Sequence, residues 1–124
     1  MKNLEYEIDK TARLVRLSYL GKPDFEEWAG TMRAVFSDPD FKTGFDFLGD
    51  RRSVKEAPAS DYIQRVVAFF RDHEAEMGRS RFAMVVSGLE TFGVGRMAQG
   101  LGAGMSLDLQ VFTDMNEAKR WLGR

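Results

Sequence analysis

The side chains that most often perform nucleophilic, acid–base or zinc chemistry give little support for a catalytic centre in this chain. The sequence contains no cysteine and one histidine, His73. The segment His73-Glu74-Ala75-Glu76-Met77 has methionine where a zinc-protease helix carries its second histidine. The Gly-x-Ser-x-Gly turn of a serine hydrolase is also missing from the sequence. We therefore expect no metal site and no enzyme activity, and we interpret His73 as a structural or surface residue beside Phe69 and Phe70.

A glycine-rich segment, Gly93-Val94-Gly95-Arg96-Met97-Ala98, matches the loose Gly-x-Gly-x-x-Ala form of a dinucleotide-binding turn. In that fold the first glycine lies in the tight turn that leaves a strand. Here residues 88–92 separate Gly93 from the preceding apolar strand, so we expect no nucleotide cofactor. We interpret the glycines as sites where a helix packs closely on a sheet. The alternative is a mobile helix that opens a cavity for an apolar ligand.

Basic residues gather in the segment Asp50-Arg51-Arg52, which is followed by Lys55. Guanidinium groups bind carboxylates and phosphates, so an anion or an acidic partner surface would be recognised here. The alternative is that these cations are solvated, and that Asp50 neutralises the cluster or caps the loop.

Hydrophobic periodicity predicts the elements that position these residues. Alternating apolar and polar residues indicate an opening β-hairpin with one solvated face. Asp24 and Asp114 are expected to be N-caps of helices, and Ser60 is expected to be the N-cap of a helix that Gly78 ends. The expected strands are 4–8, 15–19, 45–48, 82–86 and 107–112, and the expected helices are 25–36, 60–77, 89–103 and 115–122.

The resulting order, ββαβαβαβα, predicts an α/β fold in a single domain over residues 1–124. Strands separated by helices imply a mixed, mostly parallel five-stranded sheet with about four helices. Ligands usually bind such sheets at the carboxyl ends of the parallel strands. Asp50, Arg51 and Ser87 are expected in the loops at that edge.

Composition excludes several classes of partner. The chain has 18 Lys and Arg against 19 Asp and Glu, a net charge of −1, so nucleic acid is not an expected partner. The longest purely apolar run, residues 82–86, is too short to cross a bilayer, and the first residues alternate in polarity, so membrane insertion is not expected. With no cysteine, the sequence is compatible with a reducing compartment, and we expect a cytoplasmic protein.

The content of large apolar residues is high. Ten phenylalanines, seven methionines and two tryptophans are more than we expect one domain of 124 residues to bury in its own core. The surplus would line an internal pocket or form a homodimer patch, and we favour the dimer.

Several residues resemble a known family. The segment 81–86, then Phe92-Gly93 with Arg96-Met97, then residues 111–122 with Trp121-Leu122, are similar to the stand-alone STAS/SpoIIAA-like family. These are small bacterial proteins related in fold to anti-sigma-factor antagonists. The resemblance implies a cytoplasmic, non-enzymatic α/β domain that binds a protein or a small ligand, and it includes Sec14-like lipid-binding relatives.

Phosphoregulated members of that family carry an Asp-Ser-Ser-Gly motif at the start of the helix after the third strand. This chain lacks the motif, and Ser60 lies in about the equivalent place. A phosphate there would be favoured by the helix N-terminus. We interpret Ser60 as a helix cap, with phosphorylation as the alternative that the resemblance implies.

The sequence thus supports two hypotheses about function. The first is a non-enzymatic regulatory or protein-interaction domain, whose binding residues would be Asp50, Arg51, Ser60, Ser87, Phe92, Gly93, Arg96 and Met97. The second is a carrier of a small apolar ligand or lipid, whose site would be formed by Phe92, Met97, Leu101 and Met105.

Overall fold

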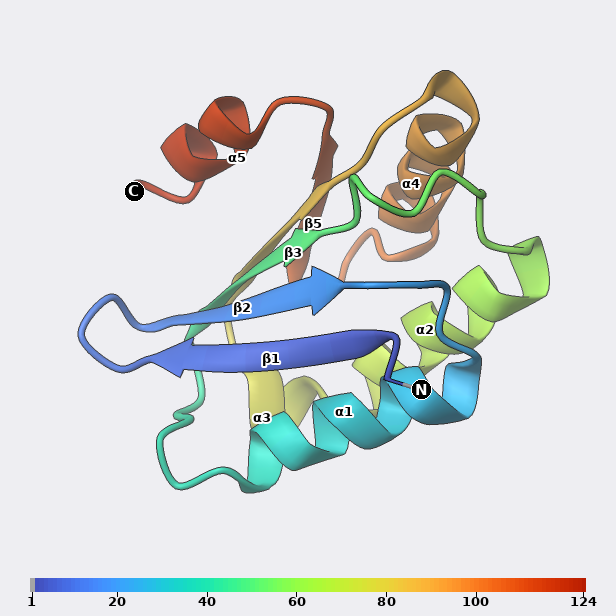
Figure 1. Cartoon of the computed structure of the whole chain (residues 1–124). Coiled ribbons are helices and arrows are strands. Elements are labelled where there is room, and N and C mark those ends of the chain that lie inside the picture. Colours follow the sequence, from blue (N-terminus) through green and yellow to red (C-terminus); the bar gives the residue numbers. More distant parts are fainter. Residues whose placement is uncertain (1) are drawn as a thin grey trace.

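The computed structural model describes residues 2–124 and contains a five-stranded sheet and five helices. In chain order the elements are β1 (Leu4–Asp9), β2 (Leu14–Tyr19), α1 (Phe25–Ser37), β3 (Asp46–Asp50), α2 (Ser60–Asp72), α3 (Glu74–Met77), β4 (Arg81–Val85), α4 (Leu89–Leu101), β5 (Asp108–Phe112) and α5 (Met115–Trp121) (Figure 1). The predicted α/β class is confirmed.

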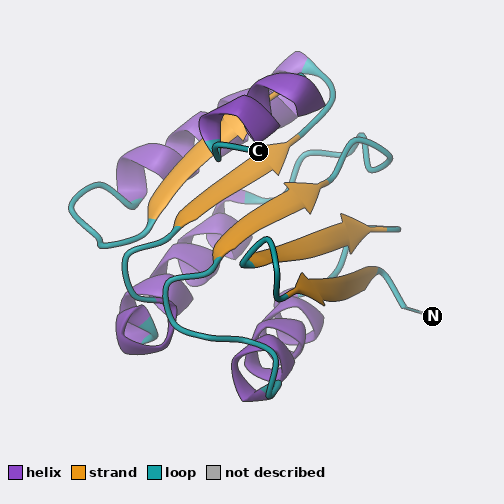
Figure 2. Ribbon diagram, turned by 90° about the vertical axis from the view of Figure 1, so that its left-hand side faces the viewer, coloured by secondary structure: helices purple, strands orange, loops and turns teal. Residues whose placement is uncertain are grey.

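The strands lie in the order β1-β2-β3-β4-β5. The hairpin β1–β2 is antiparallel, whereas β2 to β5 are parallel, with Leu17 beside Gly49 and Met84 beside Val111. Each parallel connection steps in the same direction, so right-handed crossovers place α1, α2 and α4 on one face. Helix α5 follows the last strand and covers the other face, where it packs on β4 and β5 (Figure 2).

One predicted helix is divided in two. The helix expected over 60–77 is interrupted at His73, whose backbone leaves helical geometry at φ −118° and ψ 25°. The His73 N–H donates to the carbonyls of Phe69 and Phe70, and its ring nitrogen Nδ1 lies 2.8 Å from the Phe69 carbonyl oxygen. The chain then continues as the short α3 and ends at Gly78, where φ is +67°. The count is therefore five helices, and His73 has the structural role expected from the sequence.

Two of the three predicted caps are confirmed. Asp24 accepts a hydrogen bond from the Glu27 N–H at 2.8 Å, and Asp114 accepts from the N–H groups of Asn116 and Glu117 in the first turn of α5. The prediction for Ser60 is wrong. Helix α2 has Ser60 as its first helical residue, so Ala59 occupies the cap position without a side-chain hydrogen bond and Ser60 is an exposed first-turn residue.

The buried apolar residues of the described chain form three clusters. The largest lies beneath α1 and α2, where the rings of Phe47 and Phe82 stack with centroids 5.2 Å apart. The second joins β3 and β4 to Ala118 and Leu122 of the α5 region. The smallest joins α2 to α4 through Ile63, Val67 and Ala98. Within residues 2–124 the large apolar side chains that remain exposed are Leu20, Leu89, Met97 and Leu101.

None of the phenylalanines or tryptophans is among those exposed side chains, whereas Met97 is one of them, so only a small part of the expected surplus of large apolar residues lies at the surface. Helices cover both faces of the sheet, and together they bury a larger apolar load than helices on one face would. A homodimer stays a prediction from sequence.

Candidate functional site

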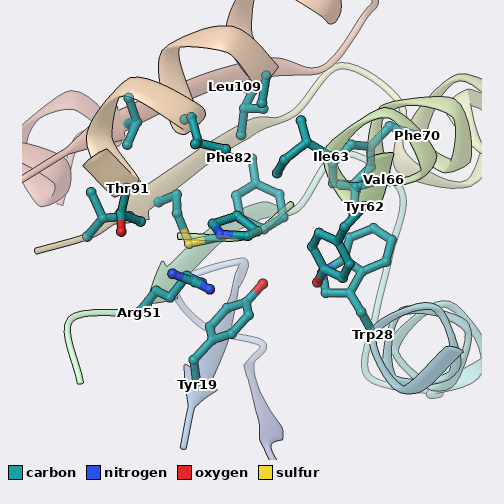
Figure 3. Close-up of a pocket in the computed structure, with 17 residues that line it drawn as sticks. Tyr19, Trp28, Arg51, Tyr62, Ile63, Val66, Phe70, Phe82, Thr91 and Leu109 are labelled. Carbon is teal, nitrogen blue, oxygen red and sulfur yellow. The ribbon is translucent and has the colours of Figure 1, made fainter. Parts of the chain in front are cut away.

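A small apolar cavity lies between the sheet, α2 and α4. Its volume is about 80 Å³, and it is found toward the carboxyl ends of the parallel strands (Figure 3). Helices contribute Trp28, Tyr62, Ile63, Val66, Phe70, Thr91, Val94, Gly95 and Ala98, and the strands and their loops contribute Tyr19, Arg51, Pro58, Phe82, Met84, Val86, Leu109 and Val111. The location agrees with the sheet edge at which ligands were expected.

Helix α4 presents its small residues to this cavity. Thr91, Val94, Gly95 and Ala98 recur at helical spacing and form the inner face. A Cβ atom added at Gly95 would lie 2.7 Å from Cγ2 of Val111, so this glycine permits the close approach of α4 to β5. The interpretation of close helix–sheet packing is therefore confirmed for Gly95.

Among the described residues that line the cavity, Arg51 alone has a charged side chain. It follows β3 directly, its backbone N–H donates to the Val85 carbonyl at 2.8 Å, and its side chain is 6% exposed. Its Nη1 donates to the carbonyls of Val54 at 3.3 Å and Glu56 at 2.9 Å. Among the described residues no carboxylate lies within 4 Å of this guanidinium. Burial lowers the pKa of Arg51 from its usual value, yet the group remains a cation near neutral pH.

The loop after β3 wraps around Arg51 and is held by three hydroxyl groups. Ser53 Oγ donates to the Tyr19 carbonyl at 2.9 Å, which joins the loop to the end of β2. Ser87 Oγ donates to the Arg52 carbonyl at 2.9 Å, and Thr91 Oγ1 donates to the Lys55 carbonyl at 3.3 Å. These contacts position the loop, and through it Arg51, against three parts of the chain that are distant in sequence.

Two tyrosines accompany Arg51 at the cavity. Figure 3 shows the Tyr19 hydroxyl and the Arg51 guanidinium on the same side of the cavity, with Tyr62 on the wall formed by α2. Burial raises the pKa of Tyr19 to about 12, although the Trp28 indole and the nearby Arg51 charge act in the opposite direction. Burial also raises the pKa of Tyr62. Both side chains are therefore neutral hydroxyls at physiological pH.

An open groove of about 360 Å³ adjoins the cavity and shares Arg51, Pro58 and Tyr62 with it. Most of the groove's other charged groups have nearby partners. Lys22 lies 3.6 Å from Glu56, and Arg65 lies 3.3 Å from Glu26 with its guanidinium over the Phe25 ring. The Asp24 carboxylate caps α1, and Asp61 is exposed at the start of α2. Arg51 is thus the buried cation where the groove meets the apolar cavity.

The structure separates the other residues that the sequence proposed for binding. Asp50 forms an ion pair with Arg52 at 2.8 Å, and hydrogen bonds from Arg52 lower the pKa of Asp50. The alternative that Asp50 neutralises the basic cluster therefore holds for Arg52 alone, and not for Arg51. Gly93, Arg96 and Met97 lie on the exposed face of α4, away from the cavity.

The residues predicted for an apolar carrier are not those of the cavity. Phe92, Met97, Leu101 and Met105 are all absent from its walls. The residues that do line the cavity include Trp28, Tyr62 and Thr91, none of which was predicted from the sequence as a binding residue. The helical spacing from Thr91 to Ala98 could have indicated this inner face of α4 in the sequence. The side chains at those positions are small, so the hydrophobic pattern is weak.

Other candidate chemistries receive no geometric support within the described chain. The segment that matched a dinucleotide fingerprint lies inside α4, so its glycines do not form a strand-to-helix turn. No cluster of three or more His, Asp or Glu side chains is placed to hold a metal ion within residues 2–124. None of the helices there combines the length and apolar character needed to span a bilayer. Comparisons with protein-family models, curated proteins and solved structures return no match for this chain.

Proposed function

We propose that the protein binds a small, largely apolar molecule in the cavity between the sheet, α2 and α4. The observation that carries the proposal is a preformed cavity of about 80 Å³ whose walls are almost entirely apolar and which adjoins an open groove. Ligand sites in α/β folds have this character, with many apolar walls and a few polar groups. The proposed role is binding, without chemistry on the ligand.

The volume limits the ligand. An apolar cavity of about 150 Å³ holds one benzene molecule, and a water molecule occupies about 30 Å³ in the liquid. The cavity therefore accommodates about three carbon-sized groups while α4 keeps its position. Longer groups would have to extend into the groove or displace α4, which Gly93 and Gly100 weaken.

The test is an NMR titration of the ¹⁵N-labelled protein with butan-1-ol, whose propyl group beyond the CH₂OH head matches the three carbon-sized groups that the cavity accommodates. We expect saturable shifts at amides of cavity residues such as Val94 and Ala98, and none at Ala118 beneath the opposite face of the sheet. Ala98→Leu would fill the cavity and abolish the response. Ala68→Leu makes the same change on the exposed side of α2 and serves as the control. Binding that survives Ala98→Leu in a folded protein would refute the assignment.

A second function is favoured by the outer face of α4. Leu89 is 89% exposed, and Met97 and Leu101 share that face with Arg96. As this second function, we propose a STAS-like regulatory role in which this surface binds a protein partner. Apolar residues rimmed by polar ones are typical of such surfaces.

The test is a pull-down assay in which the wild type and two variants serve as baits. A Met97→Ser, Leu101→Ser double variant should lose a partner that the wild type captures, while a variant of exposed Ala34 on α1 should retain it. Equal capture by all three proteins would contradict a role for this face.

A further inference from the structure

We propose that the ligand of the cavity is an organic monoanion, a carboxylate with a short apolar chain, whose head group binds Arg51. This inference rests on the proposed function and specifies the chemistry of its ligand. It follows from a buried cation, with no carboxylate of the described chain beside it, at the junction between the apolar cavity and the open groove.

The charge of Arg51 is buried without a carboxylate of the described chain beside it. Burying a cation without a counterion is unfavourable by several kcal/mol unless an opposite charge compensates it. Arg52 has Asp50, Arg65 has Glu26 and Lys22 has Glu56, each within 4 Å. Arg51 is more buried than these three residues and has two backbone carbonyls instead of a carboxylate. An anionic ligand would supply the missing charge.

The Arg51 guanidinium is held by the loop at one nitrogen only. Both hydrogen bonds from the Arg51 side chain are made by Nη1. Its Nε and Nη2 groups donate to no acceptor within residues 2–124, and Nε and Nη2 together form the edge that binds a carboxylate through two parallel hydrogen bonds. The loop therefore holds the group from one side and leaves that edge available.

The other charged groups of the groove favour a ligand with a single negative charge. Asp24 and Asp61 also line the groove, and the groove cations other than Arg51 are paired with glutamates. A phosphate carrying two charges would meet those carboxylates with one unpaired cation to offset them. A single negative charge fits this surrounding better, and the apolar cavity wall requires an alkyl or similarly apolar remainder.

The experiment compares butanoate with butan-1-ol by NMR titration of the wild-type protein at constant ionic strength. The two probes have the same number of carbons and differ in the charged head group. Hydrogen bonds to a charged group predict that butanoate binds roughly 10- to 150-fold more tightly. Affinity should also rise about fourfold for each methylene from acetate to butanoate, and then level off as the cavity fills.

Variants locate the head group. Arg51→Gln should remove the preference for butanoate while retaining binding of butan-1-ol. Arg51→Lys, which keeps the charge and loses the two-point contact, provides the second test if the glutamine variant does not fold. Arg52→Gln, at the exposed neighbour, should leave the preference unchanged.

The outcomes separate this inference from the proposed function. Equal affinity for butanoate and butan-1-ol, both bound in the cavity, would overturn the anion inference and leave the cavity proposal standing. Binding of neither probe would overturn both. A butanoate preference that Arg52→Gln abolishes and Arg51→Gln leaves intact would place the anion outside the cavity and also overturn the inference.

Discussion

The stability of α4 can be tested at two of its glycines. Gly93 lies in the interior of the helix and is exposed, and a Cβ added there has no neighbouring atom within 4 Å. Glycine in a helix interior is less favourable than alanine by about 1 kcal/mol, so Gly93→Ala should stabilise the protein by roughly that amount. For 124 residues with an unfolding entropy of about 2.1 cal/mol/K each, this corresponds to a rise in Tm of about 4 °C.

Gly95→Ala is the matched control on the same helix. Its Cβ would lie 2.7 Å from Cγ2 and 2.9 Å from Cβ of Val111, both on a β-branched side chain that has little freedom to move away. Overpacking of this kind destabilises by about 1–3 kcal/mol, which outweighs the gain in helix propensity. Calorimetry should therefore give Tm shifts of opposite sign for the two variants. Equal shifts, or destabilisation by Gly93→Ala, would refute the account of how α4 packs.

Three further predictions concern other parts of the chain. The folded protein raises the pKa of Tyr19 from 10.0 to about 12, so the contribution of this residue to the free energy of unfolding should be fully present below pH 10 and smaller by about 1.4 kcal/mol at pH 11. Urea unfolding of Tyr19→Phe should lack this pH-dependent loss. Ser80 Oγ is buried with no hydrogen-bond partner in the described residues, so Ser80→Ala should raise the unfolding free energy by about 1 kcal/mol, and a loss of stability would contradict this. Arg81 donates to the carbonyls of Trp121 at 2.6 Å and Leu122 at 3.0 Å; Arg81→Met should lower stability by about 1–2 kcal/mol and speed hydrogen exchange in α5, and unchanged exchange there would refute the tether.

The elements whose apolar residues follow a regular period were predictable. The spacing from Phe25 to Phe36 placed α1 within a residue of its observed end, and alternation placed the hairpin. The break at His73 was not predictable from periodicity. The His73 imidazole stacks on the Phe69 ring of α2, with centroids 3.9 Å apart, and on the Phe36 ring of α1, with centroids 5.7 Å apart. The contact with Phe36 exists only once α1 and α2 have packed.

The candidate site was only partly predictable, because it also depends on contacts between parts of the chain that are distant in sequence. The strand order placed Arg51 at the expected edge of the sheet, but its burial depends on the hydroxyl contacts of Ser53, Ser87 and Thr91, which span more than 30 residues of sequence. Helix α4 carries a misleading sequence signal because its large apolar residues Leu89, Met97 and Leu101 are exposed. Val111 leaves room for no side chain at Gly95, so the inner face is made of small residues that give little hydrophobic signal.

The position of Arg51 is hard to explain by the loop alone. The loop requires a donor for the carbonyls of Val54 and Glu56, and a neutral side chain of suitable length would provide one without burying a charge. The cation is unfavourable in the free protein because it is desolvated beside an apolar cavity. Binding of an anion would offset that penalty, and the resulting gain in stability would grow with ligand concentration. A charge that weakens the empty protein and strengthens the bound one is therefore better explained by ligand recognition than by support of the loop.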